Sequence, residues 1–558
     1  MVESGTARGR MKLDVSLRND VAGEPLVAGW FAWLHAIAPI PSALLTDTVH
    51  LPTMKSYVSA PQVHANAATN VALRGGQFVD LDGDRSEDVA ALIRTTESSR
   101  SLQMKMAEDL RHLDGLVGSL AKGATLDPLY DLVPPTLRGL VELVYDRSHH
   151  PSVRILEGLT YRSDAYRESD QSLDLFVVGN DARPFILSTP RLRGEGRVRL
   201  DFPLSDERLD LLFASRINPR SYAQLRDECE VSTEEECTFR SLFTEGSEAR
   251  NPGDDVSSGI RVRYFGHACV VVETAEAALI IDPMVSARPG VDGRYSWADL
   301  PERLDYCLLT HGHQDHFVLE SLLPLRHRIG AVVVPKSQPG VIEDPSLKMA
   351  LTALGFPVVI EVDAFDALPF GRGEILATPF FGEHADLGIT SKVTYVVDAS
   401  DNRILFAADS AAQHHELFDR IYDTVGPIDT VFLGMECDGA PVTWLYGHLF
   451  SHPIERRMSR SRKLSGSNAR QAMQMIERTG ATRAYVYVMG QEPWLQHIMA
   501  TNYTEGNIQN RAVAEVLDEC HRRGVEAERL LISRTFEWNS ESRKVGASSG
   551  WINPKVSC

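Results

Sequence analysis

Hydrophobic and polar positions divide the chain into two parts of different character. In the first part, residues 86–120 have helical periodicity, with apolar residues spaced three or four apart: Met106, Leu110, Leu113, Val117 and Leu120. This stripe predicts a helix that packs against its own domain. The alternative is that the stripe forms a dimer seam, the interface between two copies of the chain. Polar and apolar residues alternate along 173–178, which predicts a strand. The first part should therefore mix helices and strands.

Three further stretches of this part have a local pattern but no clear function. Residues 29–34 (GWFAWL) form an aromatic cluster that favours a core helix, with an interface segment as the alternative. Residues 136–145 follow Pro134-Pro135 and are expected to form an amphipathic helix. His149-His150 precedes Pro151 and favours a loop over a metal site, because adjacent histidines point in different directions.

The pattern changes after a polar, glycine-containing stretch at residues 246–259, which we interpret as a linker. The boundaries expected from it are an N-terminal mixed α/β domain at 1–245, a second domain at 260–535 and a tail at 536–558. The second domain contains apolar runs typical of strands at 261–265, 270–273, 279–282, 306–310, 331–335, 375–378, 394–398, 404–409, 430–434 and 484–488. Helical patterns lie between them at 317–328, 414–425 and 468–479. This order predicts two sheets with helices outside, an α+β fold.

Composition narrows the classes of function. The chain has 558 residues, a formal net charge of −19 and a pI near 5.4, which disfavours nucleic acid and anionic membranes as partners. Its seven cysteines are scattered without a CxxC pair and indicate free thiols. The most apolar N-terminal stretch, residues 27–40, is too short to span a bilayer. We therefore expect a cytoplasmic protein.

A dense set of ligand-type side chains follows the apolar run 306–309. His311, His313, Asp315 and His316 lie within six residues, and Gly312 allows a sharp turn among them. In an extended loop, His311 and His313 point the same way and can share one metal, while Asp315 and His316 can reach a second. The spacing predicts two adjacent metal sites.

Other candidate ligands also come at the ends of apolar runs. Asp409 follows one such run and could bridge two metals through its two oxygens, and Asp282 could orient a metal-bound histidine. Of the neighbours Glu383 and His384, only one is expected to face the site. An imidazole there would suit zinc and a hydrolase, whereas a carboxylate would suit iron and oxygen chemistry. Spacing alone does not decide between them.

This set of motifs resembles the metallo-β-lactamase fold, an αββα sandwich with a two-metal site. Further segments resemble the diiron β-hydroxylase family of chloramphenicol biosynthesis: Tyr130 to Pro134, Arg183 to Pro190, Pro379 to His384, Gly434 to Pro441, Leu464 to Asn468 and Met489 to Trp494. The resemblance implies two irons on His311, His313, Asp315, His316, Glu383 and Asp409, with Glu383 rather than His384 as ligand and Asp409 as bridge.

The same resemblance implies an activity and its partners. It implies a cytoplasmic oxygenase of antibiotic biosynthesis that hydroxylates the β-carbon of an aminoacyl thioester on a nonribosomal peptide synthetase carrier domain. O2 and an external electron donor are then co-substrates, and the N-terminal domain at 1–245 could form a homodimer or cap the active site. The alternative is a dizinc hydrolase such as a thioesterase. Trp444, Tyr446 and Trp494 could line the amino-acid pocket or simply pack in the core.

Two features lie outside this pattern. Hydrolases of this fold usually have a last histidine after the strand at 484–488, but this chain has Met489-Gly490-Gln491 there, with His448, His452 and His497 as other candidates. The run 456–463 (RRMSRSRK) is densely basic in an acidic chain. It could be the docking surface for an acidic carrier domain or a solvated loop.

Overall fold

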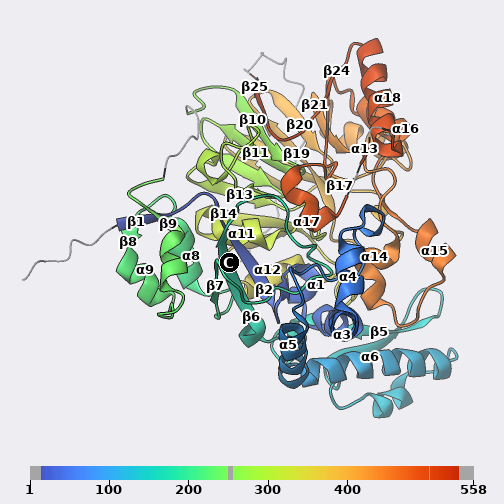
Figure 1. Ribbon diagram of the computed structural model, residues 1–558. Coiled ribbons are helices and arrows are strands. Elements are labelled where there is room, and N and C mark those ends of the chain that lie inside the picture. Colours follow the sequence, from blue (N-terminus) through green and yellow to red (C-terminus); the bar gives the residue numbers. More distant parts are fainter. Residues whose placement is uncertain (1–13, 249–254, 502, 505, 539–558) are drawn as a thin grey trace, which may run out of the picture.

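The computed structural model describes residues 14–248, 255–501, 503–504 and 506–538 (Figure 1). Its C-terminal half contains two seven-stranded sheets. The first runs in the order β15 (Val359–Val362), β14 (Ile329–Pro335), β13 (Leu304–Leu308), β12 (Ala278–Ile281), β11 (Cys269–Thr274), β10 (Ile260–Gly266) and β25 (Arg534–Trp538). The second runs β16 (Ala367–Phe370), β17 (Gly373–Pro379), β19 (Val393–Ala399), β20 (Asn402–Phe406), β21 (Thr430–Gly434), β23 (Arg483–Tyr487) and β24 (Glu526–Arg529).

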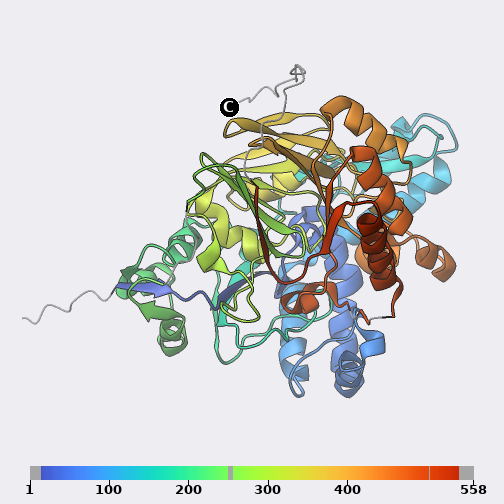
Figure 2. The same ribbon diagram turned by 90° about the horizontal axis from the view of Figure 1, so that it is seen from above.

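The two sheets pack face to face because alternate residues along their strands are apolar. Val262 and Tyr264 of β10 meet Tyr395 and Val397 of β19 in one buried cluster. Helices α11 (Leu319–Leu325) and α12 (Leu347–Ala353) pack on the outer face of the first sheet. Helices α13 (Glu416–Val425), α16 (Ala469–Thr479) and α18 (Ile508–Arg522) cover the second (Figure 2). The predicted αββα sandwich and its ten strands are confirmed.

The end of the second domain differs from the expected boundary at 535. Strand β25 continues to Trp538 and pairs antiparallel with β10 along its length, with Phe536 opposite Val262. The first sheet therefore includes the start of the expected tail, because Thr535, Phe536 and Trp538 extend the strand pattern. Residues 539–558 and 249–254 of the expected tail and linker lie outside the described residues.

The N-terminal half is built on a four-stranded antiparallel sheet, β3 (Trp30–Phe31), β2 (Val21–Val27), β6 (Gln171–Val177) and β7 (Arg197–Leu200). Smaller sheets join β1 (Asp14–Leu17), β8 (Arg220–Ser221) and β9 (Phe243–Glu245), and β4 (Val141–Tyr145) with β5 (Pro151–Ile155). The helices are α1 (Leu34–Ile37), α2 (Pro39–Leu45), α3 (Leu51–Ser59), α4 (Pro61–Ala68), α5 (Ser86–Ser99), α6 (Ser101–Leu120), α7 (Glu157–Thr160), α8 (Glu207–Ala214), α9 (Tyr222–Glu228) and α10 (Glu236–Ser241). The expected mixture of helices and strands is confirmed.

The apolar stripe predicted for residues 86–120 packs within its own domain. The helical stretch is interrupted at Arg100, and the stripe belongs to α6. Its first four residues are buried against α2 and the β4–β5 hairpin, whereas Leu120 is 49% exposed. The stripe is therefore core, as the simpler interpretation predicts.

Two helix predictions in this half are wrong. Residues 136–145 form turns and then β4, because Gly139 has a φ of +77° that no α-helix accommodates and Val141 and Leu143 alternate toward the core. In 29–34, Trp30 and Phe31 form β3, and helix α1 begins only at Leu34. The aromatic side chains are nevertheless buried, so their interpretation as core is confirmed.

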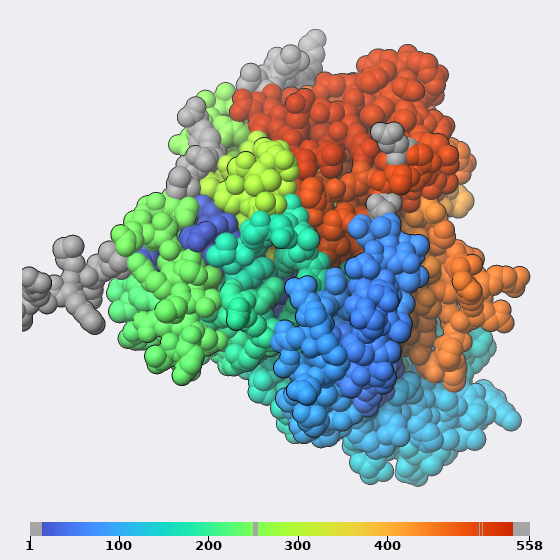
Figure 3. Space-filling model, viewed as in Figure 1, coloured from blue at the N-terminus to red at the C-terminus, as the bar shows by residue number. Residues whose placement is uncertain are grey.

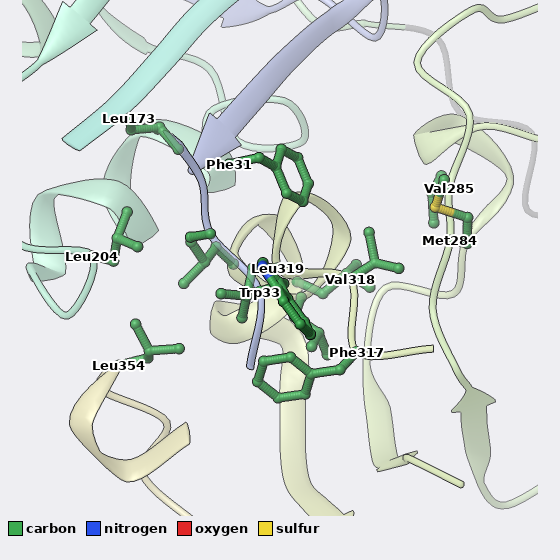
Figure 4. Packing of buried hydrophobic residues seen from close by; sticks show 14 of the residues in the cluster. Phe31, Trp33, Leu173, Leu204, Met284, Val285, Phe317, Val318, Leu319 and Leu354 are labelled. Carbon is green, nitrogen blue, oxygen red and sulfur yellow. The ribbon is translucent and has the colours of Figure 1, made fainter. Parts of the chain in front are cut away.

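The two halves share one hydrophobic core (Figure 4). Phe31, Trp33 and Leu173 of the N-terminal half lie in the same cluster as Phe317 and Leu319, which follow the candidate metal loop. The contact reaches the loop itself, because a Cβ atom on Gly312 would lie 2.5 Å from Leu34 Cδ2. The N-terminal half therefore supports the candidate site directly.

Two absences in the described part of the chain bear on the sequence-based expectations. No helix there is long and apolar enough to cross a membrane. The six cysteines within it are all free.

Candidate metal centre

The loop after β13 is held by a buried carboxylate at the end of the neighbouring strand. Asp282 follows β12 and is fully buried. Its Oδ1 accepts a hydrogen bond from the backbone N–H of Thr310 at 2.8 Å, and its Oδ2 accepts one from the Thr310 hydroxyl at 2.6 Å. The same Oδ2 lies 2.8 Å from Nδ1 of His316. Asp282 thus orients the start of the loop and one candidate ligand, the role expected from the sequence.

The loop brings a first set of ligand atoms together with residues from a short strand of the second half. His311, His313, Glu383 and His384 offer atoms that lie within 4.8 Å of one another. Glu383 and His384 form β18 (Glu383–His384), which pairs with β22 (Leu464–Ser465). His313 Nδ1 is 3.4 Å from Glu383 Oε1. The structure brings both neighbours to the site, so the expectation that only one of them faces it is wrong, and the choice of Glu383 as the ligand stays a prediction.

A second set lies beside the first and is joined to it by Asp409. Asp409 Oδ2 is 3.0 Å from Nε2 of His316 and 3.8 Å from Nε2 of His311. Asp315 Oδ2 is 3.4 Å from the same nitrogen of His316. Asp409 thus lies beside histidines of both sets, and its role as a bridge stays a prediction. All six predicted ligands therefore converge at one place.

Several buried polar atoms of this site have no hydrogen-bond partner among the described residues and could bind a metal. His311 Nε2 and His384 Nε2 are buried and lack a hydrogen-bond partner in the described part of the chain. Such atoms are costly unless something binds them. Burial lowers the pKa of His313 to about 4, against the opposing effect of Glu383, and so keeps the imidazole neutral and able to bind a metal.

An aromatic hydroxyl orients the second histidine of the loop. Tyr446, at the end of α14 (Val442–Tyr446), is buried, and its OH lies 2.7 Å from Nε2 of His313. That contact leaves Nδ1 of His313 to face Glu383. Of the aromatic residues singled out in the sequence, Tyr446 therefore touches a ligand, Trp444 lines the adjoining cavity, and Trp494 lies against Gly266 outside it.

Two residues of the site were missed by sequence reasoning. His267 lies between β10 and β11, and its Nε2 is 2.9 Å from Asp315 Oδ2. Glu436 follows β21, and its Oε1 accepts a 2.6 Å hydrogen bond from the hydroxyl of Tyr503. Burial, opposed by that bond and reinforced by nearby carboxylates, raises the pKa of Glu436 to about 8. Glu436, like Asp409, follows an apolar run that predicts a strand, so the sequence could have indicated it. His267 is a single histidine in a turn, and no pattern in the sequence indicates it.

The three histidines considered as a last ligand lie elsewhere. His448 Nε2 is 3.2 Å from Nδ1 of His35, His497 is 3.8 Å from Glu320, and His452 is exposed. None belongs to a metal-type cluster among the described residues. His267 is the histidine that lies beside Asp315 and His316 instead.

The centre opens into a cavity of about 300 Å³. Five carboxylates line it against one arginine, Arg74: Asp315, Glu383, Asp409, Glu436 and Asp438. Crowded carboxylates repel one another in a buried site, and cations offset that repulsion. Trp444, Met499 and Tyr503 form other parts of the wall. The arrangement can hold two cations beside a small acidic chamber.

Comparison with known proteins agrees with this geometry. Residues 16–246 match the family model described as the diiron non-heme β-hydroxylase N-terminal domain, and residues 278–487 match a β-lactamase superfamily domain. The 4-amino-L-phenylalanyl-[CmlP-peptidyl-carrier-protein] 3-hydroxylase of Streptomyces venezuelae is 36% identical over 93% of this chain and 99% of its own length.

Solved structures show the same relationship over nearly the whole chain. The crystal structure of CmlA, a diiron β-hydroxylase from Streptomyces venezuelae, has a TM-score of 0.88 and 35% identity, covering 94% of this chain and all of its own. The structure of a CmlA point mutant has a TM-score of 0.87 and 34% identity over the same share of both chains. A metal-dependent hydrolase from Brucella anthropi is 31% identical over only 13% of this chain.

Proposed function

The chain belongs to the family of diiron non-heme β-hydroxylases, and we propose that it hydroxylates the β-carbon of an amino acid held as a thioester on a carrier domain. The curated relative acts on such a substrate, 4-amino-L-phenylalanyl on a peptidyl carrier protein. The observation that carries the proposal is the joining of two ligand sets by Asp409 beside an acidic cavity.

The proposed ligands are the six residues that converge in the structure. His311, His313 and Glu383 would hold one iron, Asp315 and His316 would hold the other, and Asp409 would bridge them. Bound iron would supply the reduction of O2. In the overall reaction a C–H bond becomes C–OH, the second oxygen atom leaves as water, and an external donor supplies two electrons with two protons.

The chain itself positions the substrate and the ligands. Tyr446 and Asp282 fix the imidazoles of His313 and His316, so the ligand atoms are in place before a metal binds. Glu436 and Asp438 line the cavity without being proposed iron ligands, and they would face the α-ammonium group of an aminoacyl thioester. Trp444 and Met499 provide apolar surface for its side chain.

A basic helix near the cavity supports docking of a carrier domain. Arg456, Arg457 and Arg460 of α15 (Arg456–Ser461) are exposed and make no ion pair among the described residues, and Met458 beside them is 45% exposed. Carrier domains are commonly acidic around their prosthetic arm, so this helix would favour encounter. A cytoplasmic location, where such synthetases work, is part of the proposal.

Metal analysis followed by a single turnover tests the proposed function. Protein grown with ample iron should contain two irons per chain, and the reduced protein should add one oxygen atom to the carrier-bound amino acid under O2. Mass spectrometry of the arm detects that addition. Two zincs per chain and release of the free amino acid would instead establish a thioesterase and overturn the proposal.

Charge reversal tests the docking helix separately. Arg457→Glu with Arg460→Glu should raise the apparent KM for carrier-bound substrate by about tenfold at low salt and leave iron content unchanged. The matched control reverses Arg94 of α5 and Lys122 just after α6, which are exposed and unpaired among the described residues. An unchanged KM in the α15 variant would exclude this helix.

A further inference from the structure

A second, larger cavity adjoins the metal cavity. It has a volume of about 930 Å³, and its walls come from residues 73–85, 176–197 and 493–500. Arg74, Gly75 and Ala500 line both cavities. The blue, blue-green and red parts of the surface that carry these segments adjoin on the face shown in Figure 3. These three residues therefore lie between the two cavities, and we call this boundary the throat.

The throat is fixed by contacts between the two halves of the chain. The indole N–H of Trp444 donates a 2.9 Å hydrogen bond to the carbonyl oxygen of Gly75. Gly75 has a φ of +75°, and a Cβ atom there would lie 3.1 Å from the same indole nitrogen. Trp444 also stacks on Phe185 of the outer wall, with ring centroids 5.9 Å apart. The N-terminal loop is thus held over the metal cavity by one side chain of α14.

We propose that the outer cavity receives the phosphopantetheine arm of the carrier domain, so that the aminoacyl thioester reaches the metal cavity through the throat. The inference rests on the proposed function and assigns the path by which the substrate enters. The inner cavity, at about 300 Å³, has room for an amino-acid residue but not for the arm as well. The outer cavity supplies the additional length.

The charges along this path match the two ends of the tethered substrate. In the inner cavity, the two acidic residues that are not proposed iron ligands, Glu436 and Asp438, lie where the α-ammonium group would bind. The outer cavity has six arginines and four acidic residues in its wall: Arg74, Arg85, Arg183, Arg191, Arg193 and Arg197, with Asp80, Asp82, Asp181 and Glu195. The phosphodiester would lie at this more basic end.

Only some of these arginines are free to bind a phosphodiester. Arg183, Arg191 and Arg197 converge on the buried carboxylate of Glu24, which they serve as structural partners. Arg193 is 54% exposed, and its ion pairs with Asp201 and Glu235 are solvent-accessible, so exchanging them costs little. Arg74 is exposed and has no ion pair among the described residues. Arg193 is therefore the candidate for the phosphodiester at the outer end, whereas Arg74 lies at the throat.

Two glycines allow the outer cavity to be filled without disturbing its walls. Gly179 and Gly194 line it, their φ angles are in the ordinary range, and a Cβ atom on either would meet nothing within 4 Å. Gly179→Trp and Gly194→Trp should therefore place bulk in the space of the arm. Gly118→Trp, on the exposed face of α6 with equally open space, is the matched control.

The experiment compares two forms of carrier domain by calorimetry, one with an amide-linked aminoacyl-phosphopantetheine arm and one without any arm. The holoenzyme and the Gly118→Trp control should bind the arm-bearing carrier at least about tenfold more tightly than the armless one. In Gly179→Trp and Gly194→Trp that difference should disappear, while affinity for the armless carrier and iron content stay the same. An unchanged difference in both variants would overturn the inference.

Turnover distinguishes failure of the inference from failure of the proposed function. If the native protein hydroxylates carrier-bound substrate and the two tryptophan variants do so at the native kcat/KM, the arm takes another path and the function stands. If the native protein forms no hydroxylated product, both proposals fail. An aminoacyl thioester of N-acetylcysteamine, which lacks most of the arm, should react equally with native and variant proteins.

Discussion

His316 and Asp282 form a fully buried pair in which Nδ1 of the imidazole lies 2.8 Å from the carboxylate. Because the same carboxylate also accepts two hydrogen bonds from Thr310, it fixes both a ligand and the loop that carries three others. Asp282→Asn should weaken iron binding by about 10–100-fold, since the amide cannot accept from every partner. Chelator competition measures the change, and Asp401→Asn, an exposed carboxylate on a turn, should have no effect.

His267 should affect one of the two metals. Its Nε2 lies 2.9 Å from Asp315, and its φ of +51° is one that asparagine tolerates. His267→Asn should therefore keep the fold and weaken the metal on Asp315 and His316 by about tenfold or more, so that dialysis leaves one iron per chain. His448→Asn, a change to a buried histidine outside the centre, should retain both irons. Equal iron loss from both variants would contradict this assignment.

Glu383 and His384 provide a test with matched side chains at neighbouring positions. If Glu383 is the ligand, Glu383→Gln should lower iron affinity by at least about tenfold, because a neutral amide replaces an anionic donor. His384→Gln should change it much less, although both residues lie in the same cluster. Metal analysis after dialysis decides between them. The reverse order would make the site richer in imidazole and closer to that of a zinc hydrolase.

Glu157 should make stability depend on pH. Burial raises the pKa of Glu157 from 4.5 to about 7, opposed by its hydrogen bond from the Ser346 N–H and reinforced by Asp344. Between these values the folded state keeps a proton that the unfolded state has lost, so the free energy of unfolding should fall as pH rises from 4.5 to 7 and level off above. Glu157→Gln should make that fall in the free energy of unfolding smaller by about 1–3 kcal/mol. Tm measured as a function of pH detects the change. If Tm has the same pH dependence in the native protein and in Glu157→Gln, Glu157 does not keep a proton in the folded state.

The α6 stripe should contribute to stability but not to oligomerisation. Leu113 is fully buried, whereas Leu120 on the same stripe is 49% exposed. Leu113→Ala should destabilise the protein by about 2–5 kcal/mol, and Leu120→Ala by less than about 0.5 kcal/mol. Thermal unfolding measures both, and sedimentation should show an unchanged oligomeric state. A shift in sedimentation for Leu120→Ala would instead support the dimer seam.

The parts of the fold that the sequence predicts are those with local signals. Ten strands after residue 260 are predicted correctly because each is a short apolar run, and the candidate ligands stand out because they come directly after such runs, as at His311 and Asp409. The helix predicted at 136–145 failed because one glycine, Gly139, has a φ of +77°, and the apolar spacing there suits either structure.

The features that the sequence does not predict depend on contacts between residues far apart in the chain. His267 is a single histidine in a turn, and only the packing of β10 beside the metal loop brings it to Asp315. The role of the N-terminal half could not be predicted either, since neither Gly75 nor Phe185 has a signal that relates it to Trp444. Glu436 could have been found, because it follows a strand as Asp409 does.

The close contact between Leu34 and Gly312 has a consequence for how such proteins can diversify. The stretch at 246–259 resembles a natural crossover point for genetic recombination, yet a chimaera joined there would place an unrelated surface against Gly312 and an unrelated loop over Trp444. A change of substrate preference that involves this contact would therefore need coordinated substitution in both halves. A catalytic half transplanted alone would keep its metal ligands but lose the walls that surround them.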